Sequence, residues 1–366
     1  MKDKLVGANI GEPLDVGNQS SLQCEGVNIE LIMASRPQQQ HKGGRGGGRG
    51  GGRGGQGGPK GGNSGNRENQ RGGRNEAPKI NFPVVEHCTY IDTHVHLEYI
   101  LERVASKGGN RAASSSATED VSPMDKIVAS YPTHANFEGC IAVFCDATAL
   151  SPSLAIWPEF LKDKRVWAAF GLHPHTAQYY SDSLEARIID ALAHDKAVAW
   201  GECGLDFAKM HSEKQVQMDC FARQIKAAVT IGKPIMVHSR KAAQETYDLL
   251  AEHAPKDHPI HLHCFGDGVE DAQKFLAHFT RMYIGFTGMI TWEKSDYLRD
   301  VVKIVPLDRI LLETDGPYHF PGNNPKAINH SGTIPAIAAE IAKVKEVPIE
   351  VVYHQIRQNT TDIYGI

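Results

Sequence analysis

The chain lacks the features that mark a membrane protein or a disulfide-stabilised secreted protein. No stretch approaches the ~20 consecutive apolar residues that a membrane span needs, and the N-terminus carries no apolar signal segment. The seven cysteines form no CxxC pair and no zinc-finger spacing, and most of them lie within apolar runs. We therefore predict a protein of a reducing compartment, cytoplasmic or nuclear, without a membrane partner.

Residues 1–84 lack the apolar periodicity of a packed domain. Between residues 43 and 73 the sequence reads GGRGGGRGGGRGGQGGPKGGNSGNRENQRGG and contains none of the side chains that form a core. Such a segment cannot offset the entropy lost on ordering glycine. We predict a disordered low-complexity tail over residues 1–84, with an RGG-type segment at about 43–74.

The tail and the rest of the chain carry opposite charge. Eight lysines and arginines and a single acidic residue, Glu68, lie between residues 41 and 75, although the whole chain has a net charge of -4. Arginine-glycine segments attract phosphates and stack on bases with little sequence preference. The tail therefore predicts DNA or RNA as a partner, and nothing in the sequence fixes the oligomeric state.

From residue 85 onward, short β-rich runs alternate with stretches of helical periodicity. The runs number eight and lie at 90–97, 139–147, 166–174, 197–206, 234–240, 260–265, 281–289 and 309–315. Helical patterns occupy 217–231, 241–253, 269–279 and 296–304, and two closing helices are predicted at 334–345 and 349–359. The order predicts a (β/α)₈ TIM barrel over residues 85–366.

One connection within the predicted barrel is unusually long. Residues 98–138 include the stretch GGNRAASSSATEDVSP, which predicts a mobile surface loop after the first strand. That position is the carboxyl end of the barrel, where active sites of this fold lie. The sequence leaves open whether this segment is a tolerated insertion or covers a substrate.

Polar residues that can bind a metal stand at the ends of five of the eight runs. In DTHVH the two imidazoles share one face of a strand, since side chains two residues apart point the same way. The six candidates are His94, His96, Glu202, His238, His263 and Asp315. Burying such groups is costly unless they are paired or bound to a cation, so their convergence predicts a metal centre.

The types of ligand narrow the choice of metal. Imidazole and carboxylate without thiolate suit Mg²⁺ or Mn²⁺, and also Zn²⁺ or Fe²⁺. Cys203 and Cys264 adjoin two of the candidates, but strand alternation predicts that both thiols point away. Six ligands exceed the need of one closed site, so we predict two divalent ions sharing Glu202, with Asp315 as general base and second catalytic residue.

Four further residues are candidates for work around this centre. Arg240 offers a bidentate fork for phosphate, or a salt bridge inside the barrel. His173 and His175 end the third run and could bind a phosphate oxygen, protonate a leaving group or be structural. Asp206 lies on the same face as Glu202 and is predicted to orient a ligand histidine from behind.

At these residues the sequence resembles the TatD family of metal-dependent deoxyribonucleases, which are amidohydrolase-like TIM barrels. The resemblance runs from about residue 90 to the end, through DTHVHL, GLHPH, GECGLDF, KPIMVHSRKA, HCFG, LLETDGPY and Asn359-Thr360. It implies the same six ligands, Mg²⁺- or Mn²⁺-supported phosphodiester hydrolysis, and 3′-to-5′ exonuclease action on single strands. The tail and the long first connection are similar to those of longer animal-type members.

Other functions stay open at this point. A barrel of this type can also hydrolyse amides or carboxylic esters, and an aminoacyl-tRNA deacylase would suit an RNA-attracting tail. A non-catalytic RNA-binding scaffold is a third reading, which the complete ligand set disfavours. Neither the choice between DNA and RNA nor that between exo- and endonuclease action is decided by the sequence.

Overall fold

The computed structural model describes residues 83, 85, 87–108 and 121–366. The contacts divide the chain into Met1–Gln39 and Gln40–Ile366, and every described residue belongs to the second unit. The predicted disordered tail, its RGG segment and most of the predicted loop after the first strand therefore lie outside the described residues.

Eight parallel strands form the sheet, each paired with the next in chain order. The prediction of a (β/α)₈ barrel is confirmed, because each predicted run overlaps one strand, although β2 begins two residues before its run. The strands are β1 (Tyr90–Val95), β2 (Phe137–Phe144), β3 (Val166–Phe170), β4 (Ala197–Asp206), β5 (Ile235–Arg240), β6 (Ile260–Leu262), β7 (Met282–Phe286) and β8 (Ile310–Leu312).

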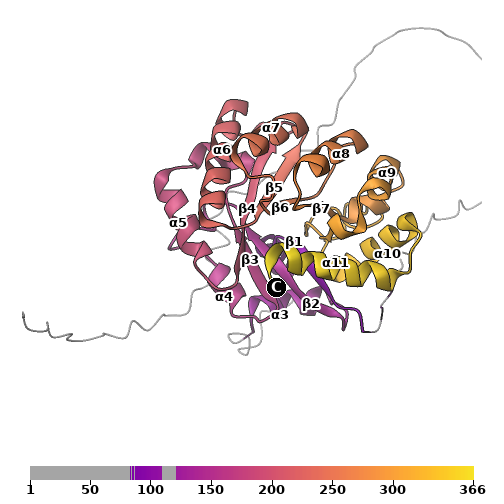
Figure 1. Cartoon of the computed structure of the whole chain (residues 1–366). Helices are drawn as coiled ribbons and strands as arrows, with labels where there is room; N and C mark the ends of the chain where they lie inside the picture. Colours follow the sequence, from indigo (N-terminus) through magenta and orange to yellow (C-terminus); the bar gives the residue numbers. More distant parts are fainter. Residues whose placement is uncertain (1–82, 84, 86, 109–120) are drawn as a thin grey trace, which may run out of the picture. The chain divides into compact units, whose positions relative to one another are not determined.

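Helices follow the strands and surround the sheet, as Figure 1 shows for α5 to α10. They are α2 (Leu97–Gly108), α3 (Pro123–Ser130), α4 (Trp157–Leu161), α5 (Asp182–Leu192), α6 (Lys214–Ile231), α7 (Ala243–His253), α8 (Val269–His278), α9 (Asp296–Ile304), α10 (Ile334–Lys345) and α11 (Ile349–Tyr364). Short 3₁₀ segments are η1 (Pro174–Tyr179), η2 (Gly288–Thr291), η3 (Leu307–Arg309) and η4 (Ser331–Thr333). Helices α2 and α3 flank the undescribed part of the long connection.

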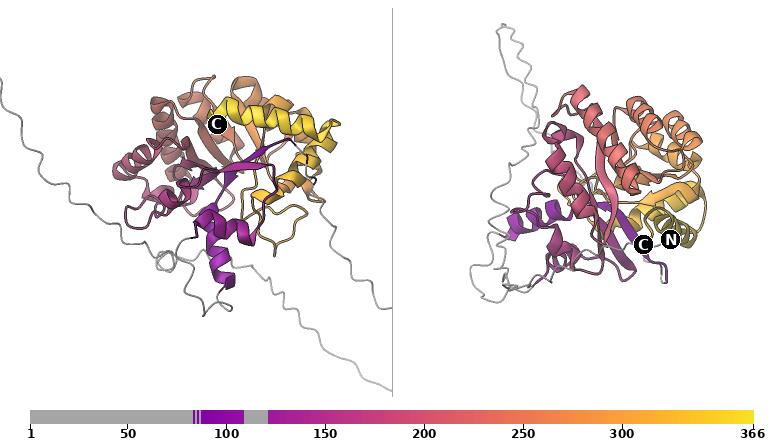
Figure 2. Two further views of the ribbon diagram at one scale, coloured as in Figure 1. Left: turned by 90° about the horizontal axis from the view of Figure 1, so that it is seen from below. Right: turned by 60° about the vertical axis from the view of Figure 1, so that its left-hand side comes forward.

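The last helix is longer than the sequence pattern indicates. The predicted end at Asn359 is wrong by about a turn, because α11 continues to Tyr364 and ends at Gly365, which has φ 73°. Ile363 and Tyr364 are buried in the core cluster beneath the sheet, and this packing outweighs the polar sequence NTTD before them. Figure 2 shows α11 at one end of the barrel and α2 at the other.

Among the described residues, the backbone pairing that closes the barrel lies at its carboxyl end, between β1 and the segment after β8. Val95 and Gly316 form the single isolated bridge there. The Asp315 amide donates to the His94 carbonyl over 2.9 Å, and the His96 amide donates to the Gly316 carbonyl over 2.8 Å. The closing bonds are therefore made by the residues that bear the predicted metal ligands.

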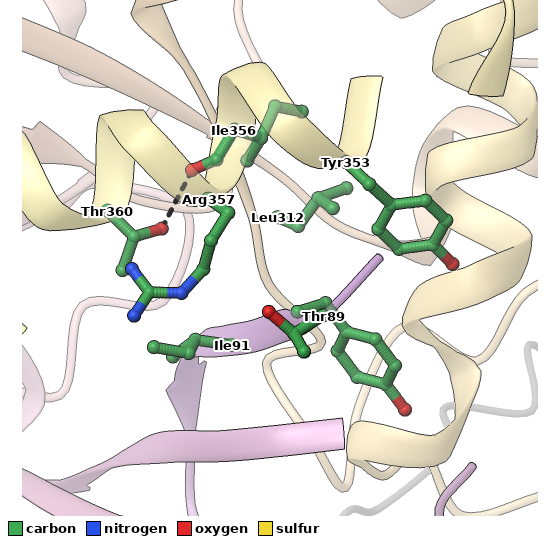
Figure 3. Close-up of a pocket in the computed structure, with 8 residues that line it drawn as sticks. Thr89, Ile91, Leu312, Tyr353, Ile356, Arg357 and Thr360 are labelled. Atoms are coloured by element: carbon green, nitrogen blue, oxygen red, sulfur yellow. Dashed lines mark hydrogen bonds between the residues drawn. The ribbon is translucent and has the colours of Figure 1, made fainter. Parts of the chain in front are cut away.

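Away from that closure, a shallow crevice lies between β1, β8 and α11, shown in Figure 3. Its lining includes Ile91, Leu312 and Ile356, and the Thr360 hydroxyl donates to the Ile356 carbonyl within the helix at 2.9 Å. None of the predicted ligands lines it. The crevice therefore lies along the junction of β1 and β8 and is separate from the predicted metal ligands.

Asp92 fastens this junction from inside. Its carboxylate accepts the Thr314 amide at 2.9 Å, the Thr314 hydroxyl at 2.6 Å and the Ser331 hydroxyl at 2.8 Å. The side chain is fully buried, so each of these bonds replaces water that the carboxylate has lost. Asp92 thus holds β1 to the segment after β8, directly below His94.

Replacing Asn359 by alanine tests the attachment of α11 to the barrel. The buried Asn359 amide donates to the carbonyls of Leu307 and Ile310, both at 2.8 Å. The Leu307 carbonyl also accepts the Ile310 amide, but both bonds from Asn359 are lost, and we expect the free energy of unfolding to fall by about 2 kcal/mol. Urea denaturation measures this.

The matched control is Gln358→Ala on the same helix. Gln358 donates only to Asp362, in an exposed pair one turn away. Its loss should change stability by less than about 0.5 kcal/mol. Equal effects of the two substitutions would contradict the assigned role of Asn359.

Candidate metal centre

The structure brings all six predicted ligands to the carboxyl end of the barrel. They come from β1, β4 and β5, from the residues that directly follow β1 and β6, and from the third residue after β8. His94, Glu202 and His263 are at most 3% exposed. A ring of buried imidazole and carboxylate groups thus forms where eight apolar strands end.

Four ligand atoms form a first cluster: Nε2 of His94, Nε2 of His96, Oε2 of Glu202 and Oδ1 of Asp315. Their separations run from 3.3 to 3.7 Å for the five pairs within bonding or ionic range. Atoms that bind one ion at about 2.1 Å lie roughly 3.0–3.4 Å apart. The cluster therefore has nearly the spacing of ligands around a single divalent cation.

A second cluster forms on the other side of Glu202. Oε1 of Glu202 lies 2.7 Å from Nδ1 of His238 and 2.9 Å from Nε2 of His263. The two imidazole nitrogens are 3.4 Å apart. The two oxygens of one carboxylate thus face different groups of imidazoles, which is the arrangement expected of a carboxylate between two ions.

Local backbone geometry produces this convergence. Asp315 has φ 51°, in the left-handed region, so the chain turns sharply at the end of β8 and brings its carboxylate toward β1. Gly204 has φ 145°, and a Cβ there would lie 2.0 Å from the His238 carbonyl oxygen. Only glycine therefore lets β4 approach β5 closely enough for Glu202 and His238 to meet.

The electrostatics of the site keep both carboxylates ionised. Burial raises the pKa of Glu202, but the charge of His263 and hydrogen bonds from the imidazoles outweigh it and hold the pKa well below its usual range. Burial likewise raises the pKa of Asp315, and hydrogen bonds from His319 and His96 lower it far more. Two buried anions surrounded by imidazoles form a donor set that fits divalent cations.

The four residues predicted around the centre lie at its edge. Nε2 of His173 is 3.6 Å from Oε1 of Glu202, which places His173 beside the second cluster. Nε2 of His175 is 2.9 Å from Oδ2 of Asp206, and Nε2 of His238 is 3.4 Å from the same oxygen. Asp206 therefore contacts the outer nitrogen of a candidate ligand.

Arg240 extends from the end of β5 toward the mouth of the barrel. Its side chain is 52% exposed, and among the described residues its ion-pair partner is Asp206, at 3.9 Å. A salt bridge of that length at a half-exposed group uses little of the guanidinium's capacity to donate. The fork therefore remains available to an anion entering from solvent.

The structure overturns one prediction about the thiols. Cys203 points away, with its Sγ 3.8 Å from the Met236 carbonyl. Cys264 does not, because its φ of 46° takes it out of strand geometry, where alternation no longer applies. Its Sγ groups with ligand atoms of Asp315 and His319, all within 4.8 Å of one another.

Two residues at the centre have no counterpart among the sequence candidates. The Cys145 thiol, just after β2, lies 3.6 Å from Oε2 of Glu202. Nε2 of His319 lies 3.2 Å from Oδ2 of Asp315. Cys145 lies near the end of a predicted β-run, so the sequence could have indicated it as a site residue. His319 lies in an irregular segment after β8, where no sequence pattern indicates its position.

An eight-stranded barrel with imidazoles and carboxylates gathered at the carboxyl ends of its strands is the framework of a metal-dependent hydrolase. Comparison with known families makes this specific. The family model described as TatD related DNase matches residues 91–365. The chain belongs to the TatD family.

Two relatives of known name are consistent with this. The human 3′-5′ RNA nuclease TATDN2 is 36% identical over 282 residues, which are 76% of this chain and 35% of that protein. The 3′-5′ ssDNA/RNA exonuclease TatD of Escherichia coli is 35% identical over 156 residues, 42% of this chain and 59% of that one. The chain thus spans about a third of the human protein and more than half of the bacterial one.

A solved structure shows the same fold. YJJV, a TatD homologue from Escherichia coli, has a TM-score of 0.60 at 24% identity and covers 76% of this chain and 99% of its own. In the part of the chain that the structure describes, no helix is long and apolar enough to cross a membrane.

Glu202→Gln tests whether the two clusters bind ions together. Adding Mn²⁺ at about 100 times its Kd should stabilise the metal-free wild type by about 2.7 kcal/mol per site. Replacing a bridging carboxylate by an amide removes charge from both clusters, so we expect the variant to gain less than half of the stabilisation. Thermal unfolding with and without Mn²⁺ measures it.

Glu252→Gln is the control, because the Glu252 side chain is 71% exposed and lies in the last turn of α7, where the chain returns to the start of β6. It should respond to Mn²⁺ as the wild type does. A Glu202→Gln protein with a full Mn²⁺ response would count against the shared carboxylate.

Proposed function

We propose that the protein is a two-metal nuclease that hydrolyses phosphodiester bonds, acting as a 3′-to-5′ exonuclease on single strands. The observation that carries the proposal is the position of Glu202, whose Oε2 lies 3.6 Å from both His94 and His96 while Oε1 lies within 2.9 Å of His238 and His263. One carboxylate facing two imidazole pairs suits two ions and exceeds what one ion requires.

The residues divide naturally between the two ions. His94, His96 and Asp315 would hold one ion with Glu202, and His238 and His263 would hold the other with the same carboxylate. Mg²⁺ or Mn²⁺, or Zn²⁺ in their place, would supply positive charge that polarises the phosphate and lowers the pKa of water.

Asp315 is the proposed general base. Hydrogen bonds from His319 and His96 hold its pKa well below the usual range, so the group is ionised, which is the form that a general base needs. His319, 3.2 Å from Oδ2, fixes the orientation of the group, while Oδ1 faces His96 at 3.4 Å. The base is thus positioned from both sides.

Substrate binding falls to the edge of the site. The half-exposed Arg240 guanidinium can grip a phosphate at the mouth of the barrel, and His173 and His175 can donate to its oxygens or to the leaving group. The basic tail, outside the described residues, would hold the rest of the nucleic acid near the barrel.

The relatives support polarity and strandedness. The human relative is named a 3′-5′ RNA nuclease and the bacterial one a 3′-5′ ssDNA/RNA exonuclease. RNA is common to both names. We therefore propose single-stranded RNA as a substrate, with single-stranded DNA as the second to test.

Asp315→Asn tests the reaction. Wild type with Mg²⁺ or Mn²⁺ should shorten 5′-labelled single-stranded RNA and DNA stepwise from the 3′ end, and less so hairpins. An amide cannot accept the proton, so the variant should be slower by about 10²–10⁴-fold. Gel analysis of end-labelled oligonucleotides resolves the products.

The same products separate the proposal from its alternative. A deacylase or amidohydrolase would leave the polymer at full length while releasing an acyl group. Intact oligonucleotides with metal-loaded wild type would therefore contradict the proposed nuclease.

Arg240→Ala tests the phosphate contact. Because Arg240 touches neither candidate ion, we expect KM to rise about tenfold with a smaller change in kcat, the result of losing one charged hydrogen-bond donor. Steady-state kinetics on a short oligonucleotide measures both. Arg281 directly precedes β7, at the amino end of the barrel, so Arg281→Ala should leave both constants unchanged. An equal rise of KM in Arg281→Ala and Arg240→Ala would refute the assignment.

A further inference from the structure

A continuous row of buried polar side chains runs through the barrel interior below the metal centre. The Tyr364 hydroxyl lies 2.7 Å from Nδ1 of His261, and Nε2 of His261 lies 3.0 Å from Oε2 of Glu313. The other oxygen of Glu313 accepts the Cys264 amide and lies 3.8 Å from Nδ1 of His263. The row thus links the C-terminal end of α11 to a candidate metal ligand.

The barrel provides a dedicated space for this row. His261 comes from β6 and Glu313 follows β8, so the two must meet across β7. A Cβ at Gly285 of β7 would lie 2.4 Å from the Glu313 carboxylate and 2.5 Å from the His261 ring. Glycine at that one position of β7 therefore makes the contact possible.

The hydrogen bonds can be arranged in one consistent direction. If Nδ1 of neutral His261 accepts the Tyr364 hydroxyl, its proton is on Nε2, which lies 3.0 Å from Oε2 of Glu313 and so faces a negative charge. Oε1 of Glu313 lies 3.8 Å from Nδ1 of His263, beyond hydrogen-bond distance, and its negative charge favours the proton of His263 on that nitrogen. That tautomer leaves the lone pair of Nε2 directed at the second cluster, where Glu202 lies 2.9 Å away.

Packing alone does not account for these residues. His261 and Glu313 are completely buried, in a layer where apolar side chains would cost less to bury. Neither belongs to the six candidate ligands. Carboxylates behind a ligating histidine commonly fix its ring and tautomer, and here a second histidine and a tyrosine in turn fix the carboxylate.

We propose that Glu313, His261 and Tyr364 are positioning residues that set the tautomer and orientation of His263, and thereby the affinity for the ion held by Glu202, His238 and His263. The inference rests on the proposed two-ion function. If the proposal is correct, the packing of the C-terminal end of α11 against the barrel influences the affinity for this ion through Tyr364.

The test uses the full chain and Co²⁺, whose visible absorption reports its coordination. Metal-free wild type, Tyr364→Phe and Glu313→Gln are titrated with Co²⁺, and both binding constants are fitted. We expect the affinity for the ion held by Glu202, His238 and His263, the second ion, to fall about tenfold in Tyr364→Phe and about 10–100-fold in Glu313→Gln. The affinity for the first ion, held by His94, His96, Glu202 and Asp315, should change much less. The spectrum of the second ion should also shift.

Tyr353→Phe is the matched control, since Tyr353 is a buried tyrosine of the same helix outside this row. Tyr353→Phe should bind both ions as the wild type does. Urea denaturation without metal should give similar free energies of unfolding for Tyr364→Phe and Tyr353→Phe. Tyr364→Phe loses one hydroxyl only, so it remains informative if Glu313→Gln does not fold.

The possible results separate a failure of this inference from a failure of the proposed two-ion function. If wild type binds two Co²⁺ ions and Tyr364→Phe binds them with unchanged constants and spectrum, the positioning role is refuted while the two-ion centre stands. If wild type binds fewer than two ions at the centre, both fail. Selective weakening of the second ion in Tyr364→Phe, absent from Tyr353→Phe, supports the proposal.

Discussion

Closure of the barrel between β1 and β8 is the constraint on which the site depends. The two strands share one bridge, Val95 with Gly316, and the amides of Asp315 and His96 make the closing hydrogen bonds. Because the closure occurs where the ligands stand, it fixes Asp315 beside the imidazoles of β1. The buried Asp92 carboxylate holds the same junction from below. Fold and metal centre are therefore stabilised by the same few bonds.

Such a site is costly to build from side chains alone. Glu202 and Asp315 are nearly fully buried anions, and burial of a charge is unfavourable unless compensated. The surrounding imidazoles supply part of the compensation, as the lowered pKa of each carboxyl shows. Divalent cations would supply the rest, and the donor set of imidazoles and carboxylates fits them.

Much of the centre is readable in the sequence because strands obey simple rules. Alternation and the carboxyl-end position of barrel sites are enough to place His94, Glu202 and His238 together. The rules fail where the backbone leaves strand geometry. Cys264 turns its thiol into the site through a positive φ, and His319 reaches Asp315 from an irregular segment. The contact of His261 with Glu313 across Gly285 depends on the register of three strands, which no local pattern encodes.

We propose that Glu202 lies between two metal ions. Anomalous diffraction from crystals grown with Mn²⁺ locates such ions directly. We expect two manganese peaks at the carboxyl end of the barrel, one beside His94, His96 and Asp315 and one beside His238 and His263, with one Glu202 oxygen directed at each. A single peak, or ions that Glu202 does not touch, would contradict it.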